Sequence, residues 1–144
     1  MRSMIGIIAL VGVLVAPRPA AAQSVRYKVI VNAANPASVL MASELSRIYL
    51  GTANVWPDRT LVLAIDQKNG SLRETFLHDI VGKDSTTLSR YWEQAIFSGK
   101  GVPPRTLSSD GEIVDFVRKN PGAIAYVDAS TPLDPSIKTM RIVR

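Results

Sequence analysis

Short apolar segments alternate with longer amphipathic segments over most of the chain. Apolar residues that recur every three or four positions are typical of helices packed on a core, whereas short continuous apolar runs between turn signals are typical of strands. The helical pattern occurs in residues 42–50, 71–81, 86–97 and 109–120. The strand pattern occurs in residues 27–31, 61–65, 123–127 and 138–143.

The strand patterns predict how the sheet is covered. The run LVLAI at 61–65 is apolar at every position, which is typical of a strand that is buried on both faces beneath helices. We expect the last run, KTMRIV at 138–143, to be an edge strand. Because strands alternate with helices, the pattern predicts a compact α/β domain with a central sheet flanked by helices. The pattern leaves the strand order open.

Turn and capping residues indicate where the helices end. Gly51 and Gly82 follow the first two helices, at the position where a left-handed residue commonly ends a helix. Ser109 and Glu112 form a capping box that opens the last helix. The helix at 86–97 carries an apolar stripe that we expect to be buried, made of Leu88, Tyr91, Trp92, Ala95 and Ile96.

Residues 1–22 have the composition of an export signal. Arg2 precedes an uncharged apolar run, Met4–Ala16, and prolines then separate this run from the small residues Ala20, Ala21 and Ala22. The alternative is a membrane anchor, but a spanning helix needs roughly 20 apolar residues. We therefore expect cleavage after Ala22, a periplasmic location, and a single domain formed by residues 23–144.

Composition excludes several classes of function. The chain has no cysteine and one histidine, which excludes disulfides, thiol nucleophiles and multi-histidine metal centres. The formal charge of +5 comes without a dense basic run, so we expect no nucleic-acid partner. Acidic residues are scattered singly, and we expect neither a metal nor another cofactor. Asp66 and Asp84 lie near loops and are interpreted as turn or capping residues.

A hydrolase-like site is also excluded by spacing. Ser71, His78 and Asp79 are close in sequence, but Ser71 and His78 lie on one predicted helix about 10.5 Å apart along its axis. A nucleophile and its base must lie within about 3 Å of each other. His78 falls opposite the apolar stripe and is expected to face solvent. We therefore expect a binding protein rather than an enzyme.

The segment DQKNGSLRETF at 66–76 is the strongest candidate for a binding site. A buried strand ends there, Gly70 follows in a polar loop, and a helix begins at Ser71. Free backbone N–H groups and the positive end of the helix dipole meet at such a junction, which makes it suitable for an oxyanion. Gly70 lets a ligand approach the backbone, and Ser71 can either cap the helix or turn its hydroxyl to an anion.

Arg73 supports this interpretation. A cation in the first turn opposes the helix dipole, so helix stability alone does not favour it. The helical spacing places Arg73 beside the packed face, where a guanidinium could grip an anion. The alternative is an arginine paired with a nearby acid such as Asp66, and the pattern leaves both open. Weaker candidates lie before the last helix: Arg105, Ser108 and Ser109, of which the serines are mainly caps.

Five segments in order together resemble the phosphate ABC transporter substrate-binding proteins, and more closely the short, single-lobe members of that periplasmic-binding-protein-like group. The resemblance covers residues 27 to 128, almost the whole expected domain. Its segments are Glu44–Gly51, Trp56–Asp58, Gly70–Phe76, Tyr91–Pro104 and Asn120–Val127.

The resemblance implies a type-2 periplasmic binding protein fold, of which this chain would form about one lobe. In the full-length relatives, a Ser-Gly-Thr segment at a helix start binds phosphate beside an arginine. Gly70, Ser71 and Arg73 occupy that place here, whereas Leu72 stands where a small or hydroxyl-bearing residue is expected. The full-length relatives close two lobes around the ligand, and residues 23–144 supply one.

The resemblance therefore implies an exported solute-binding-like protein for phosphate or a similar oxyanion, linked to ABC-type phosphate uptake. Its expected partners are the anion and either a membrane transporter or a second lobe-bearing chain. The alternative is a non-catalytic periplasmic interaction module that kept the lobe fold and lost ligand binding.

Overall fold

The computed structural model describes residues 26–144. The predicted export signal lies outside the described residues, as do the first three residues of the predicted domain. Within the described part, no helix has both the length and the apolar character needed to cross a membrane.

The centre of the molecule is a mixed five-stranded sheet in the order β4-β3-β5-β1-β6. Strand β3 runs parallel to both β4 and β5, whereas β1 runs antiparallel to β5 and β6. A small second sheet pairs β2 with β7 in parallel. The strands are β1 Tyr27–Asn32, β2 Val39–Met41, β3 Leu63–Gln67, β4 Arg105–Leu107, β5 Ala123–Asp128, β6 Ile137–Thr139 and β7 Arg141–Val143.

The helices fall close to the predicted segments. They are α1 Ala42–Tyr49, α2 Ser71–Phe76, η1 Leu77–Val81, α3 Ser85–Phe97 and α4 Asp110–Lys119. The segment predicted as one helix over 71–81 instead changes at Leu77 into the π-helix η1. Its last turn is wide because the N–H of Gly82 donates to the carbonyl of Leu77 at 2.8 Å. Gly82, at φ 70°, then ends the helix in the left-handed region.

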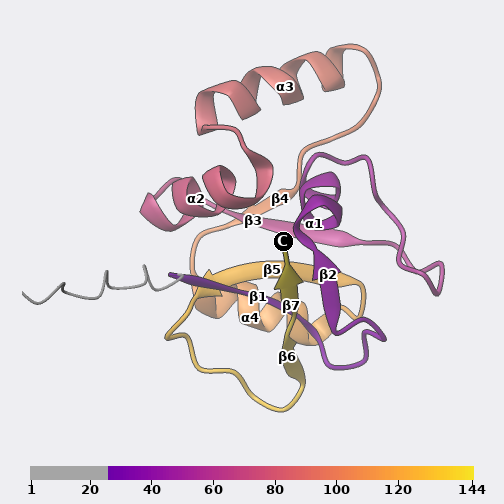
Figure 1. Cartoon of the computed structure of the whole chain (residues 1–144), viewed down its shortest axis with the longest axis vertical. Coiled ribbons are helices and arrows are strands. Elements are labelled where there is room, and N and C mark those ends of the chain that lie inside the picture. Colours follow the sequence, from indigo (N-terminus) through magenta and orange to yellow (C-terminus); the bar gives the residue numbers. More distant parts are fainter. Residues whose placement is uncertain (1–25) are drawn as a thin grey trace, which may run out of the picture.

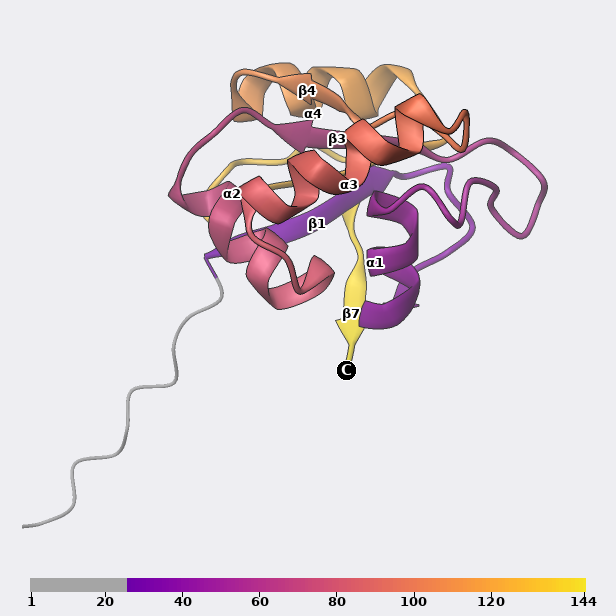
Figure 2. The ribbon, with the colours of Figure 1, turned by 90° about the horizontal axis from the view of Figure 1, so that it is seen from above.

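Helices cover both faces of the five-stranded sheet (Figures 1 and 2). Helix α4 lies on one face, and α1, α2 and α3 lie on the other. Side chains alternate along β5, so Ile124 and Tyr126 belong to the core beneath α1 and α2, whereas Ala125 and Val127 belong to the core beneath α4. This arrangement confirms the predicted α/β class and the central sheet flanked by helices.

An aromatic cluster fixes α2 and η1 to the sheet. The rings of Phe76 and Tyr126 stack with their centroids 3.8 Å apart and their planes 6° from parallel. The rings of Tyr27 and Tyr49 meet Phe76 edge-on, at 5.3 and 4.8 Å. All four residues are buried. Because Phe76 is the last residue of α2, this cluster determines how the helix start, five residues earlier, is placed over the sheet.

Two strand predictions require correction. The strand predicted at 61–65 lies at Leu63–Gln67, and its expected burial on both faces is wrong at the start, since Leu61 is 66% exposed and Leu63 39% exposed. Leu61 instead forms an isolated bridge with Val55. The single strand predicted at 138–143 is divided at Met140 into β6 and β7, because the two halves pair with different strands. Strand β6 is an edge of the large sheet, as predicted.

Helix α3 is the outermost element in Figure 1. Its buried residues are Leu88 and Trp92, and the hydroxyl of Tyr91 donates to the carbonyl of Leu50 at 2.6 Å. Ile96 was predicted on the buried stripe but is 54% exposed, and Phe97 is 96% exposed. The predicted buried stripe is too long because the last turn of α3 extends beyond the core on which the helix packs.

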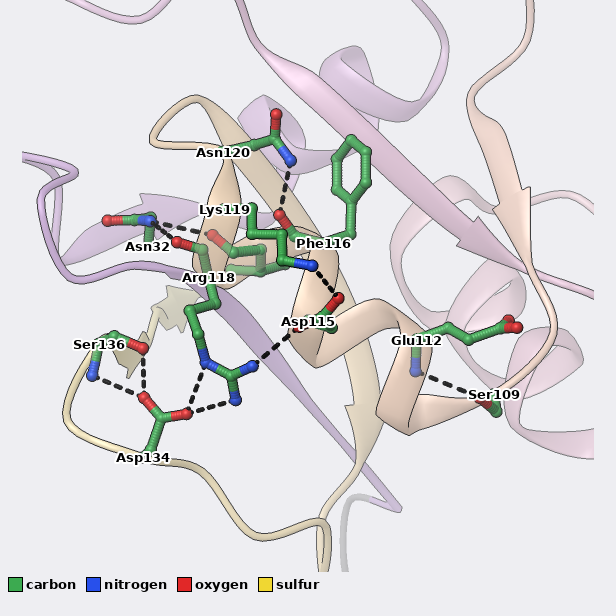
Figure 3. Close-up of polar contacts among 11 residues, drawn as sticks. Asn32, Ser109, Glu112, Asp115, Phe116, Arg118, Lys119, Asn120, Asp134 and Ser136 are labelled. Atoms are coloured by element: carbon green, nitrogen blue, oxygen red, sulfur yellow. Dashed lines mark hydrogen bonds and ion pairs between the residues drawn. The ribbon is translucent and has the colours of Figure 1, made fainter.

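Helix α4 is held at both ends (Figure 3). At its start the hydroxyl of Ser109 accepts the N–H of Glu112 at 3.2 Å, as the capping pattern predicts. At its end the buried amide of Asn32 donates to the carbonyls of Val117 and Arg118, both at 3.0 Å. These contacts satisfy carbonyls that the helix itself leaves unpaired, and they connect α4 to β1.

The loop before β6 contributes a stabilising carboxylate. Hydrogen bonds from the Ser136 hydroxyl, followed by those from the guanidinium of Arg118, lower the pKa of Asp134 to about 2 (Figure 3). Since the folded-state pKa lies below the ordinary value of 3.8, this stabilisation is present above about pH 4 and is lost as the pH falls towards 2.

We therefore expect Asp134→Asn to reduce the loss of thermal stability between about pH 4 and pH 2, because the variant has no proton to gain at this position. Melting temperatures measured across this range by circular dichroism test the prediction. Glu93→Gln, at an exposed position of α3, serves as the control. The prediction would be contradicted if the melting temperature of Asp134→Asn fell with pH as steeply as that of the unchanged chain.

Candidate functional site

The segment predicted to bind an oxyanion lies at the end of the sheet where two strands finish. Parallel strands β3 and β4 end there together, with Gln67 opposite Leu107. Helix α2 begins at Ser71 and α4 begins at Asp110, so both helix starts follow closely after these strand ends. The topology therefore places Gly70 and Ser71 at the same end of the sheet as the weaker candidates Ser108 and Ser109, although α2 and α4 cover opposite faces.

A hollow of about 410 Å³ opens at the ends of β3 and β4. Arg73 of α2 is the one predicted site residue that lines it, beside polar groups from the ends of both strands. Its lining residues are Gln67, Lys68, Asn69, Arg73 and Thr106. Two cations and three neutral polar side chains surround the space, a composition that suits an anion.

The side chain of Arg73 is held in place at two points. Its Nε donates to the carboxylate of Asp66 at 2.9 Å, and its Nη1 donates to the hydroxyl of Ser85 at 2.8 Å. The side chain is only 13% exposed, which confirms that Arg73 leans to the packed side of the helix. Of the two interpretations, the pairing with Asp66 is formed. Among the described residues none accepts a hydrogen bond from Nη2, which leaves that group free for a ligand.

Asp66 is not the turn or capping residue that was predicted. It is the last buried residue of β3 and is 4% exposed. Its Oδ2 accepts from Arg73, and its Oδ1 accepts from the Tyr126 hydroxyl at 2.5 Å and from the N–H of Gln67 at 2.8 Å. Burial, reinforced by the Asp66 charge, raises the pKa of Tyr126 far above its ordinary value. Tyr126 therefore remains a neutral donor, and the network orients Arg73. Asp84 does cap a helix, accepting the N–H of Thr87 at 2.7 Å.

The start of α2 leaves backbone donors without intrahelical partners. The first hydrogen bond within the helix runs from the N–H of Glu74 to the carbonyl of Gly70, at 3.1 Å. No side chain of the described residues caps this helix. Gly70 and Ser71 are exposed, and neither lines the hollow itself. Ser71 is two residues before Arg73, which does line the hollow, and it begins the turn that carries these N–H groups.

The start of α4 is occupied by its own protein contacts. Ser109 caps the helix, and the carboxylate of Glu112 accepts the N–H of Ser108 at 2.8 Å. The carboxylate of Asp110 accepts from Gln67 Nε2 at 2.9 Å and from the Thr131 hydroxyl at 2.7 Å. These bonds occupy the N–H of Ser108 and use the hydroxyl of Ser109 as the helix cap, in agreement with the predicted capping role.

Arg105 lies apart from Arg73. It is opposite Ile65 in the ladder of β3 and β4, and its guanidinium lies over the ring of Phe116, 5.5 Å from the centroid. Arg73 instead pairs with Asp66, the next residue of β3. Because neighbouring residues of a strand point to opposite faces, the two arginines serve different sides of the sheet.

Four lining residues were not predicted from the sequence, namely Gln67, Lys68, Asn69 and Thr106. The first three directly follow the buried part of β3, so the switch from apolar to polar residues was a signal that could have found them. Thr106 belongs to β4, which has three residues and no apolar run, so no pattern indicated it.

The position of His78 agrees with the sequence prediction. His78 is 89% exposed at its side chain and lies 3.1 Å from Asp79, facing solvent as expected. Within residues 26–144, no group of three or more His, Asp or Glu side chains is placed to hold a metal ion.

Solved structures share this fold. A protein described as a phosphate ABC transporter substrate-binding protein from Clostridium perfringens, solved with bound phosphate, matches 82% of this chain with a TM-score of 0.64 and 22% identity. An ABC-type phosphate transport receptor from Vibrio cholerae matches 81% at a TM-score of 0.62 and 16% identity. PstS from Borrelia burgdorferi matches 81% at 0.59 and 13%.

The matched region accounts for 46%, 46% and 47% of those three chains, respectively. No protein family and no curated protein matches the sequence. At these identities the similarity concerns the fold. The chain therefore has a periplasmic-binding-protein fold and spans slightly less than half the length of the phosphate receptors that share it.

Proposed function

We propose that this chain is an exported, non-catalytic binding protein for phosphate or a similar oxyanion, located in the periplasm and linked to ABC-type phosphate uptake. The anion would lie at the start of α2, between the N–H groups that follow Gly70, the hydroxyl of Ser71 and the guanidinium of Arg73. Lys68, which also lines the hollow, would add positive charge.

The position of Arg73 is the observation that carries this proposal. A largely buried guanidinium, fixed by Asp66 and Ser85, lines a polar hollow beside an uncapped helix start. A donor that is already oriented loses little conformational entropy when it binds an anion. The shared fold with proteins named as phosphate receptors supports the same ligand class.

The size of the chain sets the expected strength of binding. A hydrated oxyanion must exchange its water for many protein donors before it binds tightly. The hollow is open, and the chain that forms it matches only 46% of the length of the Clostridium perfringens protein. We therefore expect weak binding by the isolated chain, and tighter binding only if a second lobe-bearing chain or a transporter completes the site.

Titration calorimetry with phosphate and with sulfate tests the proposal. For the unchanged chain we expect heat of binding at millimolar concentrations of the anion. For Arg73→Ala we expect the affinity to fall about tenfold or more, since hydrogen bonds to charged groups are worth about 1.5–3 kcal/mol. Arg73→Ala leaves Asp66 buried without its partner, so Lys68→Gln, at an exposed position, provides a second variant that keeps the fold.

Arg141→Ala is the matched control, because Arg141 is exposed and lines none of the hollows described in this structure. Absence of heat with both ions, for a chain shown to be folded by circular dichroism, would contradict the proposal. Equal affinities in the unchanged chain, Arg73→Ala and Lys68→Gln would contradict the assigned site.

A non-catalytic periplasmic interaction module is the second candidate. The observation that favours it is that two of the three nitrogens of Arg73 already have protein partners, Asp66 and Ser85. In that case Arg73 would be a structural residue. This second function would be favoured if neither the unchanged chain nor Lys68→Gln gave any heat of binding with phosphate.

A further inference from the structure

A second hollow lies at the part of the sheet edge that β4 leaves uncovered. Strand β4 pairs only with Ile65–Gln67, whereas Leu63 and Ala64 pair with β5 on the other side. The loop that leads from α3 down to β4 passes this edge in place of a strand (Figure 1). The result is an open groove of about 530 Å³ between the edge of β3 and this loop.

The walls of this groove are mostly apolar, and closely packed or conformationally restricted residues form them. Trp92 of α3 is seated so closely on Gly51 that a Cβ there would lie 2.9 Å from its ring. The loop before β4 adds two consecutive prolines, Pro103 and Pro104, whose rings restrict the backbone. The apolar side chains of the lining include Ile48, Leu63, Trp92, Val102, Pro103 and Phe116.

The charges at this groove have one sign. Lys100 and Arg105 line it, and its lining contains no aspartate or glutamate. Both cations are exposed, and neither forms a salt bridge within residues 26–144. The guanidinium of Arg105 is held over the ring of Phe116, on the wall of the groove. The site therefore combines an apolar surface with two unpaired cations.

We propose that this groove binds a small organic anion, with an aromatic or aliphatic body and a single carboxylate. The carboxylate would lie between Lys100 and Arg105, and the body would cover Leu63 and Val102, which are 39% and 77% exposed. The volume falls in the range of small-molecule sites, about 300–1,000 Å³, which are typically apolar with a few placed polar groups.

This site is separate from the oxyanion hollow. The two hollows share no lining residue. Arg105 and Thr106 are neighbours on β4 but line different hollows, since successive side chains of a strand point to opposite faces. The proposal consequently does not depend on phosphate binding, and each site can fail without the other.

Amide NMR spectra of the full chain, titrated with phenylbutyrate, test the proposal. We expect the signals of Gly51, Ala53, Gly101 and the Trp92 indole to follow one saturating curve, while those of Lys68 and Asn69 do not move. Phenylbutylamine has the same body with a positive charge, and we expect it to bind at least about tenfold more weakly.

The double variant Lys100→Gln/Arg105→Gln is expected to weaken phenylbutyrate binding about tenfold or more, since it removes both charge-assisted contacts. The control Lys83→Gln/Arg141→Gln removes the same charge at positions that line neither hollow and should leave affinity unchanged. Equal binding of the acid and the amine would overturn the proposal. So would shifts confined to Lys68 and Asn69, or the absence of shifts at millimolar concentration.

Discussion

Replacement of Phe76 by alanine is expected to lower the free energy of unfolding by about 3–5 kcal/mol, the usual cost of removing a buried aromatic ring. The ring is fully buried and stacks on Tyr126 at 3.8 Å. It also meets Tyr27 and Tyr49 edge-on, so its loss opens a cavity at the centre of the aromatic cluster. Urea or thermal unfolding followed by circular dichroism measures the change.

Phe97→Ala is the matched control for this experiment. It makes the same substitution at a phenylalanine that is 96% exposed, where we expect a change within about 0.5 kcal/mol. A loss at Phe76 no larger than the loss at Phe97 would contradict the packing described for α2. It would also remove the basis for the placement of the helix start over the sheet.

Asp66→Ala is expected to cost a comparable amount, about 3–5 kcal/mol, because it leaves a buried charge without its partner. The side chains of Asp66 and Arg73 are 6% and 13% exposed, so solvent screens their ion pair only weakly. The substitution also removes the acceptor for the Tyr126 hydroxyl. Unfolding in urea, compared with the unchanged chain, measures the effect.

Two further variants separate the buried charge from general damage to the core. The double variant Asp66→Leu/Arg73→Met should be more stable than Asp66→Ala, because no unpaired charge remains when both partners are apolar. Asp115→Ala removes the exposed ion pairs with Arg118 and Lys119, for which we expect only a small change. If the double variant were no more stable than the single one, the ion pair would not be the cause of the loss.

The fold was predictable where local pattern and burial agree. Helix α1 lies where the spacing of Leu45, Ile48 and Tyr49 placed it, and all three residues are buried. Strands β2 and β4 were missed because each has three residues and forms only through pairing with a distant strand. The same reason explains the division at Met140. Strand order and the end of burial along α3 depend on tertiary contacts that a local pattern does not contain.

The candidate site was predictable in part. The helical spacing correctly placed Arg73 against the packed side, and the capping role of Ser109 follows from its own sequence pattern. The contacts that fix Arg73 could not be chosen in advance, since Ser85 comes from another helix and Tyr126 from a strand sixty residues from Asp66. Lys68 and Thr106 line the same hollow only because β3 and β4 are paired and end together.

A crystal structure of the chain soaked with phosphate tests the central proposal most directly. We expect tetrahedral density at the start of α2, within hydrogen-bond distance of the Ser71 N–H and of the free Nη2 of Arg73, with the Asp66 pair intact. Phosphate bound elsewhere on the molecule, or no density at this helix start in crystals that leave it open to solvent, would contradict the assignment of an oxyanion site to Gly70, Ser71 and Arg73.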